Sequence, residues 1–430
     1  MVCGQTTLSL VKPKREGLET GVIHRKVDDD PRRWAMLAVV SFAMLLSLTS
    51  WMTATAIGPE LQLKWSLSSS QLGWLTTIVQ LGFVVGTGLG AILNLADVLP
   101  SRAYFALSAF LAAVSNVLLL SSDGFSEALP ARFFTGFFLA GVYPPGMKMV
   151  STWFQSARGL AIGTVVGALT VGKATPYLLK AVGNTDTIAV IAGGSIAGLL
   201  ASILIATAYR DGPYPFPSRS FEWSRGGKLL RHRETMLATG GYLGHMWELY
   251  AMWSSIPVFL SAVFGSKSVI GDSLELAGLI TFGVFISGAA ACVAAGMIAE
   301  RIGRTATTSI MMALSGGSAL FIGFLPMELG LLISIIALVW GASVVADSAQ
   351  FSTALTELSE DTYRGTALTF QTGIGFLVTI PPIWLTPMIA DIWGWGPAFA
   401  ILGIGPMFGI TAMLKLRTMP ESLACAMGHR

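Results

Sequence analysis

Charged residues are scarce in this sequence. Asp, Glu, Lys and Arg make up 12% of its 430 residues, and the formal net charge is +3, whereas about a quarter of the residues of an average soluble protein are charged. Because the basic residues are grouped in loops and nearly balanced by acids, nucleic acid is not an expected partner. With 53% hydrophobic residues, the composition predicts a polytopic protein embedded in a lipid bilayer.

Other absences exclude other classes of protein. The three cysteines, Cys3, Cys292 and Cys425, are too far apart for a disulfide framework or a metal site. No glycine-rich loop ends in Gly-Lys-Ser/Thr, so energy would come from a gradient rather than a nucleotide. No nucleophile, acid pair or histidine cluster has a usable spacing, so we predict no catalytic residue, metal, cofactor or enzyme activity. The first 32 residues lack the apolar core of a cleavable signal peptide.

Apolar runs of about 20 residues, the length that crosses a bilayer core, predict an all-α fold of twelve transmembrane helices. They lie near residues 33–58, 71–95, 101–120, 127–150, 158–179, 187–208, 235–260, 274–299, 303–325, 329–353, 362–390 and 394–416. A polar, proline-rich segment with six basic residues separates the sixth from the seventh. The predicted parts are a tail (1–32), a six-helix bundle (33–208), a linker (209–234), a second bundle (235–416) and a tail (417–430).

Lysine and arginine counts on alternate sides of these helices give the orientation. With the N-terminus inside, the inner segments hold 21 of the 27 basic residues, and the outer loops hold only Lys64, Lys180 and Lys267. Both termini and the linker are therefore expected in the cytoplasm, with the helices crossing the plasma or inner membrane of the cell.

The two halves repeat at an offset of 206 residues. It aligns Arg158-Gly159-Leu160-Ala161 with Arg364-Gly365-Thr366-Ala367, Gly167 with Gly373, and Pro176 with Pro382. A parallel repeat of six helices places a substrate site near the membrane midplane, between two pseudo-symmetric bundles that rock against each other.

A charged segment, residues 296–304, joins two long apolar runs and must lie at a membrane face. We expect Gly296 to let two helices approach, Glu300 to accept from an arginine and Gly303 to turn the chain. Its spacing, ending in Arg304, closely resembles the loop signature of the major facilitator superfamily of transporters. The helix count, linker and repeat extend that resemblance over nearly the whole chain, which implies an inner gating role for Glu300 and Arg304.

The first-half copy of the signature is incomplete. Asp97 occupies the acid position, but Leu93 and Pro100 replace the glycines and the basic residue is displaced to Arg102. Arg132, followed by small residues at a spacing of four, resembles the family's helix-four motif, which implies a link to proton coupling. The antiporter signature of helix five is not matched, which disfavours drug efflux.

Ionisable residues at membrane depth are costly, so the few that occur are site candidates. His245 and Glu248 share one helix face and can form a proton-coupling pair, or satisfy each other or a neighbouring hydroxyl. Lys173 would attract an anion if it faces a cavity, or reach the outer interface if it does not. Arg132 contacts substrate or pairs with an acid, and Asp347 is expected at an interface.

Other candidates are uncharged or interfacial. Aromatic residues predicted at midplane depth, where they can line a cavity or simply pack, are Trp51, Tyr250 and Trp253. Gln350 and Gln371 add polar groups that need partners, and Lys148 is expected at an interface. Gly82, Gly86 and Gly90 predict close packing of helix two.

These observations predict a secondary active transporter, expected to be a monomer, that moves a small solute by alternating access. Lys173 and Arg132 favour an organic or inorganic anion, carried by symport with protons through Glu248, His245 and Arg132. A proton-driven exporter of amphipathic compounds is the main alternative, ahead of a solute sensor and a membrane-embedded enzyme. The residues leave open the substrate, the direction, the coupling ion, and symport against antiport or uniport.

Overall fold

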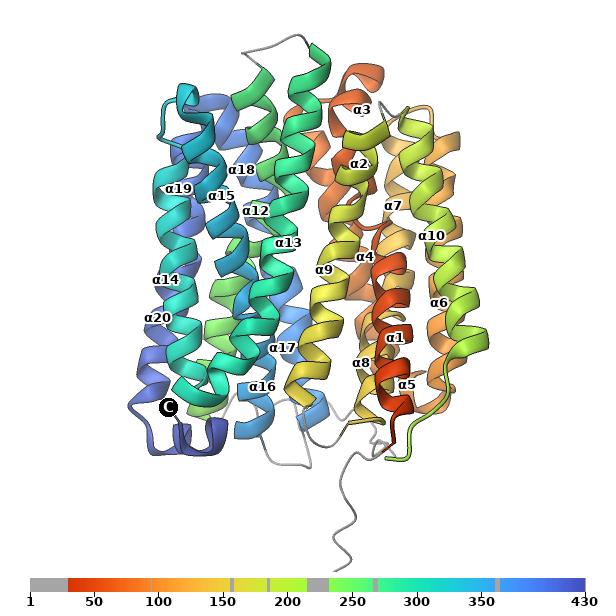
Figure 1. Ribbon diagram of the computed structural model, residues 1–430. Coiled ribbons are helices and arrows are strands. Elements are labelled where there is room, and N and C mark those ends of the chain that lie inside the picture. The colour runs from red at the N-terminus through yellow and green to blue at the C-terminus, as the bar shows by residue number, and fades with distance from the viewer. Residues whose placement is uncertain are drawn as a thin grey trace, which may run out of the picture.

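The computed structural model describes residues 30–93, 95–154, 158–183, 186–214, 232–265, 270–359 and 364–429. Throughout these ranges the regular structure is helical, without a strand. Long helices run side by side along the height of the molecule, and α1 begins at the end where the chain finishes (Figure 1). Most of the predicted N-terminal tail and linker lies outside the described residues.

The first half of the described chain contains ten α-helices. They are α1 (Arg32–Leu48), α2 (Thr53–Ala56), α3 (Gly58–Trp65), α4 (Ser69–Ile92), α5 (Leu95–Val98), α6 (Ser101–Val117), α7 (Phe125–Leu139), α8 (Tyr143–Ser151), α9 (Arg158–Gly183) and α10 (Thr187–Ala208), with the 3-10 helix η1 (Leu118–Ser121) after α6.

The second half of the described chain contains nine α-helices and three 3-10 helices. Its helices are α12 (Arg233–Gly265), α13 (Ile270–Ile302), α14 (Arg304–Ile322), α15 (Gly330–Ala346), α16 (Ser348–Leu358), α17 (Arg364–Val378), α18 (Ile380–Trp393), α19 (Trp395–Ala400) and α20 (Ile404–Arg417), with the 3-10 helices η2 (Met327–Leu329), η3 (Ile401–Gly403) and η4 (Pro420–Gly428).

Within the described ranges, nine helical segments are long and apolar enough to cross a membrane, and they coincide with nine of the twelve predicted spans. The other three predicted spans, the first, fourth and seventh, are helical as well. The first is interrupted after Leu48, the fourth after Leu139, and the seventh, α12, contains His245 and Glu248. The prediction of an all-α, multi-pass membrane fold is confirmed.

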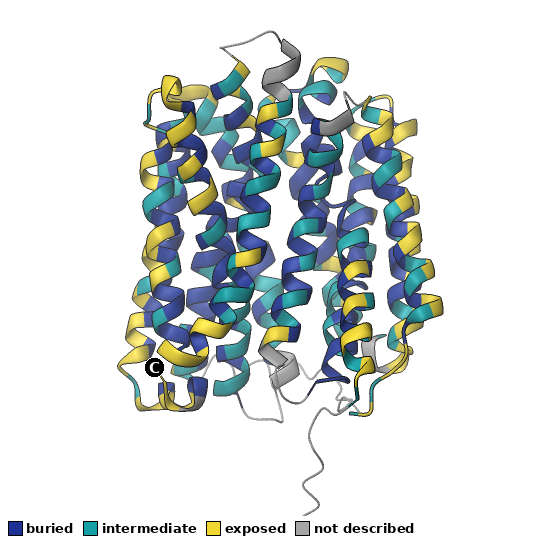
Figure 2. Ribbon diagram, viewed as in Figure 1, coloured by how far each residue is buried: buried dark blue, intermediate teal, exposed yellow. Residues whose placement is uncertain are grey.

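Buried residues fill the interior, and exposed residues lie on the periphery (Figure 2). The peripheral side chains include large hydrophobic ones such as Phe321, Leu331 and Phe408. An apolar outer face is what a helical bundle presents to lipid, because its backbone polar groups are already paired within each helix.

Close helix contacts depend on glycine in the first half. A Cβ atom on Gly82 of α4 would lie 2.0 Å from the carbonyl oxygen of Phe133 on α7, and one on Gly136 of α7 would lie 1.8 Å from that of Val79. The predicted close packing at Gly82 is therefore confirmed, and its cause is direct backbone contact between α4 and α7.

The two halves meet along two seams. One seam is formed by α9 against α13, and the other by α4 against α17 and α18. In Figure 1, α9 and α13 stand next to each other at the centre of the molecule. Side chains on these five helices, together with α12 and the segment that follows α1, form the central part of the interface.

Candidate transport site

Lys173 of α9 lies in an aromatic cage between the two halves. Its Nζ atom is 4.3 Å from the ring centroid of Trp51, 4.5 Å from that of Tyr250 and 4.9 Å from that of Trp253. It also donates a hydrogen bond of 2.5 Å to Oη of Tyr250. The side chain is 2% exposed, so Lys173 points inward rather than to the outer interface. We call these four residues the Lys173 cage.

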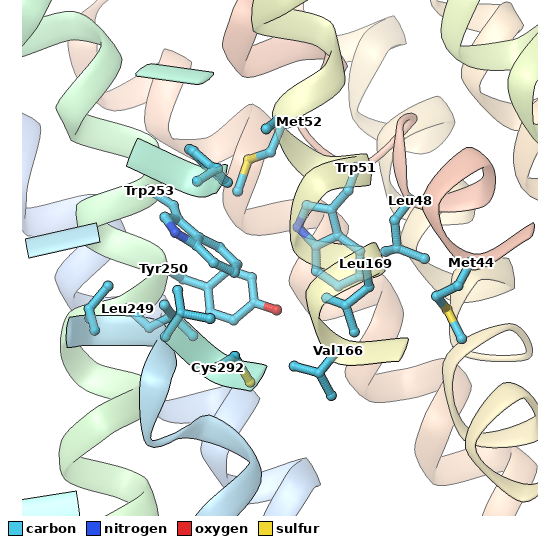
Figure 3. Close-up of a cluster of buried hydrophobic side chains, with 14 of the residues drawn as sticks. Met44, Leu48, Trp51, Met52, Val166, Leu169, Leu249, Tyr250, Trp253 and Cys292 are labelled. Carbon is cyan, nitrogen blue, oxygen red and sulfur yellow. The ribbon is translucent and has the colours of Figure 1, made fainter. Parts of the chain in front are cut away.

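The cage is divided between the two halves. Lys173 and Trp51 belong to the first half, whereas Tyr250 and Trp253 lie near the middle of α12 in the second. Figure 3 shows Trp51 facing Tyr250 and Trp253 across the space between their helices. Any rocking of the halves at this level would therefore separate the ammonium group from the tyrosine hydroxyl.

Further rings surround the cage on both sides of the interface. Phe83 of α4 lies 5.1 Å from Trp51 and 4.6 Å from Phe376 of α17, measured between ring centroids. Trp253 stacks on Phe285 of α13 at 5.0 Å. The sequence did not single out these three phenylalanines, because a phenylalanine in an apolar helix carries no signal of its own.

Among the described residues, the ammonium group of Lys173 has no carboxylate within ion-pairing distance. Its partners are the hydroxyl and the faces of three rings, which attract a cation through their quadrupoles. Within the same part of the chain, the indole N–H groups of Trp51 and Trp253 are buried without an acceptor. The site therefore has more donors than acceptors, which suits an anion.

Arg132 of α7 determines the position of Trp51. It is fully buried and donates to the carbonyl oxygens of Ser50 (3.0 Å) and Trp51 (2.5 Å) and to Oδ1 of Asn116 (3.0 Å). Those carbonyls lie in the interruption between α1 and α2, where the backbone lacks intrahelical donors. The expected pairing of Arg132 with an acid is not found among the described residues, because carbonyl dipoles take that place.

His245 is not paired with Glu248. Its Nδ1 atom lies 2.9 Å from Oδ1 of Asp347, and its Nε2 atom lies 3.0 Å from Oγ of Ser348. The interfacial position expected for Asp347 is wrong, since its side chain is 1% exposed. Asp347 sits in the short interruption between α15 and α16, which brings it beside α12.

Glu248 is buried one turn further along α12 and accepts two hydrogen bonds. Ser315 of α14 donates through Oγ at 2.7 Å, and Trp340 of α15 donates through Nε1 at 2.7 Å. The sequence left open whether Glu248 contacts His245 or a neighbouring hydroxyl group. In the structure it contacts a hydroxyl group, that of Ser315. Gln371 is fully buried, and within the described chain neither end of its amide has a partner.

A second polar contact crosses between the halves. Thr379, between α17 and α18, donates through its hydroxyl to the amide oxygen of Gln80 on α4. Nearer the end where α4 begins, Nε1 of Trp384 donates to Oγ of Ser70 at 2.8 Å. Sequence reasoning missed these pairs, although Thr379 lies 206 residues after Lys173 and so occupies the equivalent position of the repeat.

The loop signature of the second half forms a compact polar cluster around Arg304. Its guanidinium group donates to Glu300 (2.7 Å), Glu357 (2.9 Å) and Gln350 (2.8 Å). Gly303 has φ +94°, a conformation that favours glycine. The geometric expectations for Glu300 and Gly303 are thus confirmed, and Gln350 has its partner here. The cluster lies away from the Lys173 cage, at the end of α13.

Three other residues of the predicted gating motif behave differently. A Cβ atom on Gly296 would meet nothing within 4 Å, so the expected close approach of helices there is wrong. Arg102 is exposed on α6. The side chain of Asp97 lies outside the described residues.

Comparison with known proteins identifies the family. A family model described as the Major Facilitator Superfamily matches residues 39–381. The chain belongs to this superfamily. Members of this superfamily are membrane transporters of small-molecule substrates, and enzymes are not typical of it.

Several known proteins are similar in sequence to parts of this chain. The probable nitrate/nitrite antiporter NarK1 of Thermus thermophilus is 28% identical over 171 residues, 40% of this chain and 37% of that protein. The MFS-type transporter hasB of Aspergillus fumigatus is 25% identical over 355 residues, 75% of this chain and 74% of that protein. The puromycin resistance protein pur8 of Streptomyces alboniger is 29% identical over 152 residues, 35% of this chain and 30% of that protein. The chain thus spans about a third of NarK1 and of pur8.

Among solved structures, the fold is similar to a bacterial homolog of the human lysosomal transporter Spinster, crystallised in an inward-facing and unoccupied conformation. The TM-score is 0.66 at 15% identity, with 91% of this chain and 98% of the other covered. This likeness concerns the fold alone.

Proposed function

We propose that this protein is a secondary active transporter that moves a small organic or inorganic anion by alternating access, with Lys173 as the cation that binds it. The observation that carries the proposal is a buried ammonium group, without a carboxylate partner in the described chain, at the junction of the two halves. A buried charge without a counter-ion is costly in apolar surroundings. An anion that binds there would remove this cost.

The division of the cage suggests how binding and movement are linked. When the halves separate on one side, Lys173 loses Tyr250 and Trp253 and keeps only Trp51 from its own half. An anion from that side can then take the place of the hydroxyl. Closure of the halves around it restores the cation–π contacts and removes the pair from water.

For coupling, we propose that protons are exchanged by Glu248 and by His245 together with Asp347. All three are buried. Besides the contact between His245 and Asp347, their described neighbours are hydroxyl groups, one indole and the rings of Tyr242 and Phe351. Arg132 contributes by holding Trp51 rather than by binding a proton. We further propose that the protein resides in the cell membrane with cytoplasmic termini and acts as a monomeric symporter.

The test is uptake into proteoliposomes with nitrate and pyruvate as probes and a pH-sensitive dye inside. We expect at least one anion to enter saturably, with uptake reduced about tenfold or more in Lys173→Gln and partly retained in Lys173→Arg. Substrate-dependent acidification should disappear in Glu248→Gln. Equal anion uptake by the native protein and Lys173→Gln would contradict the proposal, and flux without a pH change in either would remove the proton coupling alone.

A proton-driven exporter of amphipathic cations is the second candidate. The aromatic cage and the partial similarity to a puromycin resistance protein favour it. Charge reversal separates the two functions. Lys173→Glu should abolish anion uptake, but it should preserve or increase the export of an amphipathic cation such as ethidium.

A further inference from the structure

We infer that the substrate is a monocarboxylate with a flat apolar body, for example an aromatic carboxylate. The inference rests on the proposed function, because it assumes that Lys173 binds the transported anion. It adds the charge and shape of that anion, which follow from the groups that surround Lys173.

The single negative charge of the substrate is inferred from the number of buried cationic side chains that are available to bind it. Of the deeply buried lysine and arginine side chains in the described chain, Arg132 is engaged by two carbonyls and Asn116, and Arg304 by two carboxylates and Gln350. The buried His245 lies against Asp347. Lys173 alone faces the aromatic interface. One negative charge is therefore matched, whereas the second charge of a dicarboxylate would be buried among rings without a counter-ion.

The shape follows from the ring contacts that cross the interface. Phe83 of the first half packs on Phe376 of the second at 4.6 Å, and Trp51 lies 6.0 Å from Tyr250 and 6.1 Å from Phe376. These contacts must break when the halves separate. A flat apolar body inserted between them can restore ring contacts on both faces, at the offset or edge geometries that aromatic pairs prefer.

The carboxylate group of the substrate is inferred from the hydrogen-bond donors of the Lys173 cage. A carboxylate has two oxygens, and Lys173 can satisfy one. The indole N–H of Trp51 is buried without an acceptor in the described chain, and Figure 3 shows its nitrogen on the side of the ring that faces Tyr250 and Trp253. We therefore assign Trp51 Nε1 as the donor to the second oxygen, which makes Trp51 a specificity-determining residue.

The described carboxylates near the Lys173 cage also disfavour zwitterionic and cationic substrates. The ammonium group of an amino acid would need a carboxylate beside the cage. Glu248 already accepts from Ser315 and Trp340, and Asp347 lies against His245.

Calorimetric titration of the purified full-length protein in detergent tests this, and it avoids the passive diffusion of weak acids through lipid. The probes are benzoate, acetate, phthalate, phenylalanine and nitrate. Benzoate should bind at least about tenfold more tightly than each of the others. Trp51→Phe should weaken benzoate binding about tenfold, whereas Trp65→Phe, which removes another buried indole N–H without a partner in the described chain, should leave it unchanged.

The possible outcomes distinguish failure of the monocarboxylate inference from failure of the anion-transport proposal. If nitrate or acetate binds with a dependence on Lys173 and benzoate binds no better, the monocarboxylate inference is overturned and the anion proposal stands. If no probe loses affinity in Lys173→Gln, both are overturned. The ranking of probes by the native protein decides the matter even where Trp51→Phe fails to fold.

Discussion

At the scale of single residues, three buried cations are stabilised in three different ways. Arg132 is surrounded by carbonyl and amide dipoles, Arg304 by carboxylates, and Lys173 by aromatic faces and one hydroxyl. Dipoles and carboxylates hold a guanidinium group permanently. Rings and a hydroxyl hold an ammonium group more weakly, which is what a site that exchanges ligands requires.

The hydroxyl of Tyr250 should contribute to stability through its bond to Lys173. Tyr250→Phe keeps the ring and removes the hydrogen bond, so we expect a loss of about 1.5–3 kcal/mol, typical of a bond to a charged group. Thermal unfolding of purified protein measures it. Tyr177→Phe is the matched control, because the Tyr177 hydroxyl is buried without a partner in the described chain, and its removal should be neutral or stabilising.

Arg132 should be required for the position of Trp51. Arg132→Lys keeps the charge but loses the planar fork that reaches two carbonyls and Asn116. We expect destabilisation on the order of 3 kcal/mol and an about tenfold loss of anion affinity. The exposed Arg102→Lys should change neither. Unaltered anion binding in Arg132→Lys would show that Trp51 is held by other contacts.

At the scale of helices, interruptions bring functional groups to mid-depth. Trp51 lies between α1 and α2, Asp347 between α15 and α16, and Thr379 between α17 and α18. A break frees backbone groups from the helical ladder, and these then need partners from neighbouring helices. Arg132 supplies such partners at the first break.

The α4–α7 contact gives a prediction at this scale. Gly82→Ala would place a Cβ atom 2.0 Å from a backbone oxygen of Phe133, which only movement of a helix can relieve. We expect destabilisation of about 1–3 kcal/mol or more and reduced transport. Gly88→Ala, on the same helix but with nothing within 4 Å, should be neutral or slightly stabilising in the same unfolding assay.

At the scale of the whole molecule, two equivalent positions of the repeat connect the halves. Lys173 on α9 bonds to α12, and Thr379, 206 residues later, bonds to α4. Each half therefore contributes one polar group to the interface from the same place in its fold. Ser70 and Trp384 add a further link toward one end.

The proposed rocking of the halves can be tested at the α9–α13 seam. A Cβ atom on Gly278 would lie 3.0 Å from that of Ala181, slightly less than the roughly 3.5–4.5 Å of a disulfide, so a small shift of the two helices would allow the bond. In a background with the native cysteines replaced, Ala181→Cys with Gly278→Cys should cross-link on oxidation and stop transport by at least about 90%, with recovery on reduction. Either single variant should transport normally under oxidation. Full activity of the cross-linked protein would exclude separation of the halves at this seam.

The distribution of apolar runs was sufficient to predict the helices. The contact between Glu300 and an arginine was expected from the loop segment, whereas the roles of Glu357 and Gln350 as partners of Arg304 were not. Glycine-mediated packing was foreseen at Gly82 but wrongly assigned to Gly296. Residue spacing predicts which residues share one face of a helix. It does not predict which other helix packs against that face, because this depends on how distant segments of the chain pack.

The same limit applies to the candidate site. His245 and Glu248 were identified from their cost at membrane depth, yet their partners, Asp347, Ser315 and Trp340, come from other helices. Lys173 was recognised as a charge within a membrane span that faces either a cavity or the outer interface, and three rings from the two halves define its surroundings.

Hydropathy and charge act locally along the chain, so the amino-acid sequence was enough to predict a membrane protein, the course of its helices and the repeat of its halves. The side chains that meet Lys173, the groups that Arg132 binds and the acid that faces His245 became known only from the packing of the helices. Those contacts join residues that are 16 to 122 positions apart, and their geometry depends on the packing of whole helices rather than on any local pattern.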